Sequence, residues 1–191
     1  MIDTMKKIVV FALLPILAGC LSADSPKVTQ WLLEYRGPVK TTRVPKYEVG
    51  RVSQILVRSP YNETGISVFR ADGSMAFDPY NEYAANPTAL LKGFVLDAMD
   101  ASGLFGSVVN PSSSVKSSAL VEVLIGRLAL DCRREGERKA VASVRVRIIA
   151  DGERALYAKG EGEADAKDGN YGAALSDALS KALSSAFEQL R

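Results

Sequence analysis

The 191-residue sequence contains no histidine, two cysteines and one tryptophan. Without histidine, Ser-His-Asp and Cys-His catalysis and every histidine-containing metal site are excluded. Two cysteines cannot form a four-cysteine zinc site either. With 24 basic and 22 acidic residues, the chain lacks the concentration of positive charge typical of nucleic-acid-binding domains. The composition therefore disfavours most familiar enzyme chemistries, and we expect no metal, no cofactor and no nucleic-acid partner.

The rest of the composition is that of a globular protein. Hydrophobic residues make up 47% and charged residues 24% of the chain, close to the averages for folded domains. Glycine and proline, at 15 and 8 residues, are too few for a low-complexity chain. The length suits one domain.

The first twenty residues resemble a lipoprotein signal peptide. Lys6 and Lys7 precede an apolar run, Ile8 to Leu17, which is too short to span a bilayer but fits the core of a secretory signal. The run ends in Leu17-Ala18-Gly19-Cys20, which resembles a lipobox, where a cysteine is acylated and becomes the new N-terminus. Several acyl chains on one residue suffice for stable membrane anchoring. The alternative is an ordinary signal peptide that contains a cysteine.

This N-terminal signal predicts the organisation of the chain: a signal peptide over 1–19, a lipid-anchored tether over 20–30 and one domain over 31–191. Leu21-Ser22 lacks the aspartate that resembles an inner-membrane retention signal. We therefore expect the outer membrane of a Gram-negative bacterium, with the domain facing the periplasm. Acylation of Cys20 leaves Cys132 without a disulfide partner, and a lone cysteine on a strand is usually a small buried hydrophobe.

The sequence pattern of the mature chain predicts eight strands and two helices. Asn86-Pro87 and Gly103 delimit an apolar helical stripe, and a second alanine-rich stripe begins near Gly172. Asp72-Gly73 predicts a hairpin turn. Strands are expected over 31–35, 47–58, 64–69, 74–77, 104–109, 119–132, 139–150 and 154–165. Residues 140–148 alternate in polarity, so one face of that strand is expected to be buried. The order predicts a single α+β domain, with a mixed or mainly antiparallel sheet covered by two helices.

Short motifs follow one another along this domain. They are Trp31-Leu32-Leu33 after the tether, Asp78-Pro79-Tyr80-Asn81-Glu82-Tyr83 before the Asn86-Pro87 helix entry, and Ala101-Ser102-Gly103-Leu104-Phe105 at the helix exit. Together with the lipobox, the meander around Leu128–Cys132 and the alanine-rich last helix, they resemble the ABC-type transport auxiliary lipoprotein family, the PqiC/YmbA-like lipoproteins. The sequence departs from the family in Tyr83, where tryptophan is often expected, and in its shorter, less proline-rich tether.

The resemblance implies a lipoprotein that supports movement of phospholipids or other hydrophobic molecules between the inner and outer membranes. The implied partners are a periplasmic MCE-domain protein with its permease and ATPase, and the family also implies a homo-oligomeric ring. Consistent with a separate ATPase, the sequence has no Gly-x-x-x-x-Gly-Lys-Ser/Thr loop. A second class stays open: an envelope lipoprotein that activates cell-wall synthesis or assists outer-membrane assembly. A third, a lipid-anchored hydrolase, rests only on abundant serines.

The partner-binding candidates are Tyr80 and Tyr83, which are expected in a loop rather than on an apolar stripe. Tyrosine is enriched at protein interfaces, which supports this assignment. The alternative for both is packing against the first helix.

Charged clusters give weaker candidates. Four basic residues around a turn are candidates for phospholipid headgroups, although Glu135 and Glu137 lie among them: Arg133, Arg134, Arg138 and Lys139. Two groups of carboxylates are expected to be solvated charge rather than catalytic or cation sites: Asp97 with Asp100, and Glu161 with Glu163 and Asp165. The glycines of Gly160-Glu161-Gly162 lie on a predicted strand and give little support to a nucleotide site.

Overall fold

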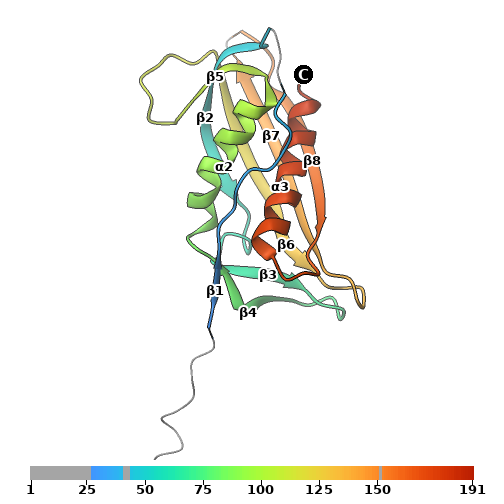
Figure 1. The fold of residues 1–191 in the computed structure, drawn as a ribbon. Coiled ribbons are helices and arrows are strands. Elements are labelled where there is room, and N and C mark those ends of the chain that lie inside the picture. The colour runs from blue at the N-terminus through green and yellow to red at the C-terminus, as the bar shows by residue number, and fades with distance from the viewer. Residues whose placement is uncertain (1–26, 41–43, 151) are drawn as a thin grey trace, which may run out of the picture.

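The computed structural model describes residues 27–40, 44–150 and 152–191 (Figure 1). Cys20, the predicted signal peptide and most of the predicted tether lie outside the described residues. The described chain forms one mixed sheet of eight strands, with two helices. The strands are β1 (Thr29–Trp31), β2 (Tyr47–Val57), β3 (Gly65–Phe69), β4 (Met75–Tyr83), β5 (Phe105–Val109), β6 (Ala119–Asp131), β7 (Lys139–Ala150) and β8 (Leu156–Asp165), and the helices are α2 (Pro87–Ser102) and α3 (Tyr171–Glu188). The predicted α+β class is confirmed.

Strand β6 organises the sheet. One edge pairs antiparallel with β7 along its whole length, from Ala119 opposite Ala150 to Asp131 opposite Lys139. The other edge is shared: β2 runs parallel to the first part of β6, and β3 runs parallel to its end at Leu130 and Asp131. Beyond these neighbours the sheet continues to β5 past β2, to β4 and β1 past β3, and to β8 past β7.

Local capping explains where α2 begins and ends. The Asn86 side chain accepts a hydrogen bond from the Thr88 amide at 2.9 Å, and Pro87 occupies the first turn, where its missing N–H is not needed. Gly103 ends the helix at φ 67°, a left-handed conformation that glycine adopts without strain. The Asn170 side chain caps α3 by accepting from the Ala173 amide. Both helices therefore form where the sequence predicts them.

The two helices cover the same face of the sheet (Figure 1). Helix α2 contacts β2 and β5, whereas α3 contacts β6, β7 and β8. The core lies between these layers and includes Phe94 and Met99 from α2, Leu179 and Leu183 from α3, and Val121 from β6. The predicted one-sided burial of 140–148 is confirmed, because Ala140, Val144, Val146 and Ile148 are buried while Arg145 is exposed.

The first strand is shorter than predicted. β1 ends at Trp31, and the following residues run between α2 and α3 (Figure 1). There the amides of Glu34 and Arg36 donate to the hydroxyls of Ser176 and Ser180, at 3.1 and 2.8 Å. These bonds to helix side chains take the place of a strand partner.

The loop predicted for residues 78–83 is wrong. These residues belong to β4, because Asn81, Glu82 and Tyr83 pair in parallel with Thr29, Gln30 and Trp31. The pairing brings together residues about fifty positions apart, which the local pattern around Pro79 does not reveal.

Candidate functional site

The two tyrosines predicted to bind a partner have different environments. The Tyr80 side chain is 55% exposed, whereas Tyr83 is only 2% exposed and packs in the core. Burial raises the pKa of the Tyr83 hydroxyl far above its usual value. Tyr83 is therefore not available to a partner, because it is buried in the core. Tyr80 remains a candidate contact.

A chain of hydrogen bonds fixes the point at which the N-terminal segment enters the domain. The Trp31 indole N–H donates to Asn81 Oδ1 at 2.9 Å, and Asn81 Nδ2 donates to Asp78 Oδ1 at 3.0 Å. The same Asp78 oxygen accepts the Tyr80 amide at 2.9 Å. On its other side, the Trp31 ring lies 6.2 Å from the Tyr171 ring of α3, between centroids. The junction of β1 and β4 is thus held from both the sheet and the helix.

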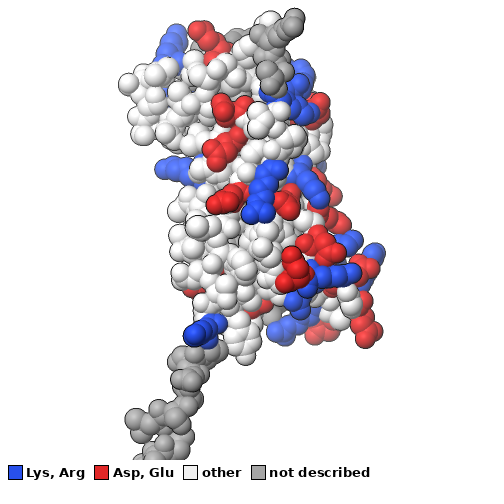
Figure 2. Space-filling model, viewed as in Figure 1, with Lys and Arg blue, Asp and Glu red and all other residues white. Residues whose placement is uncertain are grey.

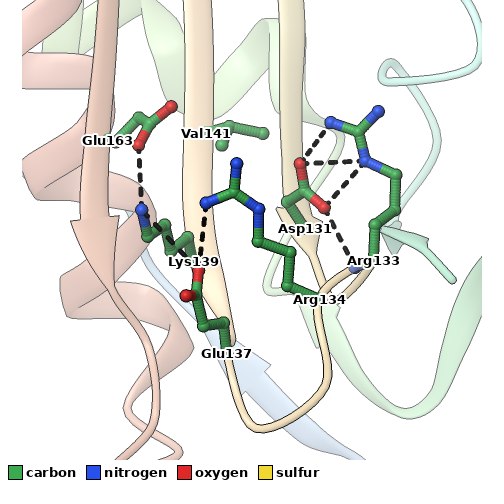
Figure 3. A pocket seen from close by; sticks show the side chains of 7 residues that line it. All are labelled: Asp131, Arg133, Arg134, Glu137, Lys139, Val141 and Glu163. Carbon is green, nitrogen blue, oxygen red and sulfur yellow. Dashed lines mark hydrogen bonds and ion pairs between the residues drawn. The ribbon is translucent and has the colours of Figure 1, made fainter. Parts of the chain in front are cut away.

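Charged side chains line a hollow of about 490 Å³ beside the β6–β7 turn (Figure 3). Arg133 makes an ion pair with Asp131, with 2.6 Å between Nη2 and Oδ2, and these hydrogen bonds hold the pKa of Asp131 below its usual range. Arg134 lies 3.7 Å from Glu137, and Lys139 is shared between Glu137 and Glu163, at 3.9 and 3.5 Å. Three cations therefore face three carboxylates.

This balance changes the interpretation of the predicted headgroup cluster. The fold brings Arg133, Arg134 and Lys139 together as predicted, but each already has a carboxylate partner. Arg138 points away from them, with its guanidinium against the hydroxyl and ring of Tyr171. The hollow is consequently a weak binding site for a lone phosphate. Sequence reasoning missed the acidic partner Glu163, which the antiparallel register of β7 and β8 places opposite Val141.

The other chemical candidates are exposed charge or packing. Asp97 and Asp100 are exposed on α2, and no group of residues in the described part of the chain could hold a metal ion. Cys132 is half-buried and packs against the core. A β-carbon added to Gly160 or Gly162 would lie only 1.8 or 2.0 Å from a carbonyl oxygen of α3. The two glycines therefore allow α3 to approach β8 and are not part of a nucleotide loop.

The face of the sheet opposite the helices offers a second contact surface. Leu56 and Tyr157 are exposed there, around a shallow hollow of about 210 Å³ that Arg145 and Arg147 also line. Arg147 lies 3.1 Å from Glu122 and 5.4 Å from the centre of the Tyr157 ring. Exposed apolar side chains among partnered charges are typical of protein interfaces. No sequence motif marks this surface, because its residues come from four separate strands, β2, β6, β7 and β8.

On the helix-covered face that Figure 2 shows, Lys and Arg lie among Asp and Glu mainly on the side of α3, and much of the other side is uncharged. No helix in the part of the chain that the structure covers is long and apolar enough to cross a membrane.

Comparison with known proteins identifies solved structures with a similar fold. No family model and no curated protein matches the sequence. Among solved structures, protein XCC0632 from Xanthomonas campestris, described as DUF330, is similar with a TM-score of 0.59 and 14% identity, over 85% of this chain and 92% of that one. A second structure, described only as an uncharacterized protein, is similar with a TM-score of 0.64 and 13% identity, over 88% of this chain and 100% of the other. At these identities the similarity shows a common fold.

Proposed function

We propose that this protein is a non-enzymatic lipoprotein anchored in the outer membrane and facing the periplasm. In this proposal it supports an ABC/MCE-type system that moves phospholipids or other hydrophobic molecules between the two membranes. The observation that carries the proposal is Leu17-Ala18-Gly19-Cys20, which supplies a lipid anchor directly before the domain. The ordered motifs from Trp31 to Phe105 support the choice of transport system, because they resemble the auxiliary lipoprotein family.

The geometry favours docking over carrying cargo. An acyl chain needs an enclosed, mostly apolar site. The hollow at the β6–β7 turn is lined mainly by charged groups, and the one on the helix-free face is shallow. We therefore assign the hydrophobic cargo to a periplasmic MCE-domain partner, with its permease and ATPase, and a positioning role to this chain. Self-assembly into a ring is part of the same proposal.

The helix-free face is the surface we assign to the protein partner. It presents Leu56 and Tyr157 between paired charges, and in the described residues no helix covers it. Aromatic and arginine side chains contribute strongly to interfaces when a partner excludes water from them. Arg147, stacked on Tyr157, is therefore the central contact in this assignment.

Cross-linking in living cells tests the proposal. A C-terminally tagged full chain is expressed in its native envelope, cross-linked in the periplasm and purified, and the attached proteins are identified by mass spectrometry. We expect an MCE-domain protein together with its permease and ATPase. Tyr157→Ser is expected to weaken this recovery, whereas Val115→Ser, a matched change of an exposed apolar residue in the β5–β6 connection, leaves it unchanged.

Two results would contradict the proposal. Recovery of a cell-wall synthase or an outer-membrane barrel protein without an MCE protein favours the alternative envelope role. Labelling of one specific serine by a fluorophosphonate favours a hydrolase instead.

A further inference from the structure

Exposed apolar side chains lie along β4 and just before β1. Met75, Phe77 and Tyr80 of β4 are 37%, 43% and 55% exposed, and Val28, just before β1, is 47% exposed. Because Thr29 pairs in parallel with Asn81, Val28 lies level with Tyr80. We call these four side chains the β4 rim. Single exposed apolar residues are common, whereas several along one strand and its neighbour are the kind of group that marks a binding surface.

The rim forms one end of the molecule. In Figure 1, β1 and β4 lie at the lower end, and the C-terminus lies at the opposite end. Within the described residues, β1 covers only 81–83 on the outer edge of β4, so no strand pairs with 75–80 on that side. Asp78 and Pro79 protect the backbone of this edge against pairing with another strand, so the exposed apolar side chains are the feature that a partner would cover.

The local hydrogen bonds hold the rim in a fixed shape. Asp78 Oδ1 accepts both the Tyr80 amide and the Asn81 side chain, so residues 78–81 of β4 are fixed around this carboxylate, and Tyr80 among them is exposed. Asn81 in turn accepts the indole N–H of Trp31. Hydrogen bonds therefore join the Tyr80 part of the rim to the entry of the N-terminal segment.

The position of Cys20 identifies the occupant. Cys20 lies seven residues before Lys27, the first described residue. Seven residues span at most about 25 Å when fully extended. A membrane that holds Cys20 is thus always within this distance of Lys27, which directly precedes Val28 of the rim, so the rim meets it at a high effective concentration. Tyrosine and basic side chains, here Tyr80 and Lys27, are both favoured at the lipid–water interface.

We propose that the β4 rim rests on the surface of the membrane that anchors the protein, so that Met75, Phe77, Tyr80 and Val28 enter the headgroup region. This inference depends on the lipid anchor of the proposed function. The acyl chains of Cys20 retain the protein, and the rim sets its orientation. The C-terminal end and the helix-free face are then directed toward the periplasm and its proteins.

A depth measurement tests this orientation. The full-length chain carries Cys132→Ala and a single new cysteine, either Tyr80→Cys or, as a matched control, Tyr157→Cys, which replaces a 69% exposed tyrosine on the helix-free face. The acylated protein, with its acylation checked by intact mass, is labelled with the fluorophore NBD. It is then placed in vesicles of phosphatidylethanolamine and phosphatidylglycerol that contain a nitroxide lipid. We expect the emission at position 80 to shift to the blue and to be quenched severalfold more than at position 157. Phe77→Cys repeats the test at a second position.

The outcomes separate this inference from the proposed function. Acylated protein with equal, water-like signals at 80 and 157 overturns the inference alone. In detergent, a blue shift at position 80 that grows with protein concentration means that a second copy covers the rim. A blue shift that appears only when envelope proteins are added means that another protein covers it. Both overturn the membrane contact. Absence of acylation at Cys20 overturns the anchor and this inference together.

Discussion

Replacing Gly162 by alanine is expected to destabilise the domain, because the new methyl group has no room beneath α3. Its β-carbon would lie 2.0 Å from the carbonyl oxygen of Ala178, whereas ordinary contacts of this kind begin near 3.4 Å. The obstacle is helix backbone, which no side-chain rotation relieves. The helix must therefore move away from β8 by more than an ångström, and overpacking of this kind costs about 1–3 kcal/mol.

Gly93→Ala is the matched control, with the same chemical change and the opposite expected sign. Gly93 is exposed on α2, and a β-carbon there meets no atom within 4 Å. Alanine favours a helix by about 0.8–1.0 kcal/mol relative to glycine, so this variant is expected to be more stable than the parent.

Urea and thermal unfolding of the domain without its signal peptide, both followed by circular dichroism, compare the free energy of unfolding and the Tm of the two variants. For a domain of this size each 1 kcal/mol moves Tm by about 2–4 °C, so Gly162→Ala is expected to lower Tm by about 2–12 °C. A Gly162→Ala protein within about 0.5 kcal/mol of the parent, the range of neutral surface changes, would refute the close contact between α3 and β8.

Three further predictions concern the junction, the helix cap and the ion pair. Asn81→Ala removes the acceptor of the Trp31 indole and should cost about 1–2 kcal/mol. Because Trp31 is the only tryptophan, its fluorescence should also shift toward the red, and unchanged emission would count against the junction. Asn86→Ala removes the cap of α2 and should cost about 1 kcal/mol in urea unfolding, whereas Asn86→Asp, another good cap, should not. Hydrogen bonds from Arg133 lower the pKa of Asp131 in the folded domain. The ion pair therefore stabilises the fold fully above the ordinary carboxyl pKa of about 4, and this stabilisation is lost as the pH falls through the lower pKa of the folded state. Asp131→Asn should therefore reduce stability by up to about 1 kcal/mol at pH 7 and by nothing once the carboxyl is protonated, and a deficit that persists in acid would contradict this assignment.

The parts of the fold that depend on local signals are predictable from the sequence. Asn86, Pro87 and Gly103 mark both ends of α2, because caps and the left-handed glycine act within one turn. Asp72-Gly73 identifies the β3–β4 hairpin for the same reason, and Gly73 adopts φ 83° there. The meander of β6, β7 and β8 follows from alternation and short connections.

The remaining features depend on contacts between distant segments. The parallel pairing of β2 with β6, and of β1 with β4, joins residues about fifty to seventy positions apart. The sequence predicts a loop at Tyr83, whereas pairing with Trp31 makes Tyr83 part of β4, where it is buried.

The candidate site shows the same division. The basic residues near 133–139 are evident from the sequence, but their neutralisation by Glu163 depends on strand register. The rim depends on register too, since only the pairing of Thr29 with Asn81 brings Val28 beside Tyr80. The glycines at 160 and 162 are visible in the sequence, but their contact with the backbone of α3 appears only in three dimensions.

Both proposals depend on a lipid at Cys20, and the intact mass of the protein extracted from the envelope tests this most directly. The account predicts a chain that begins at Cys20 and carries the added mass of its acyl groups, which Cys20→Ala abolishes. A chain that retains residues 1–19, or one cleaved there without acyl groups, would contradict the anchor and the membrane orientation built on it.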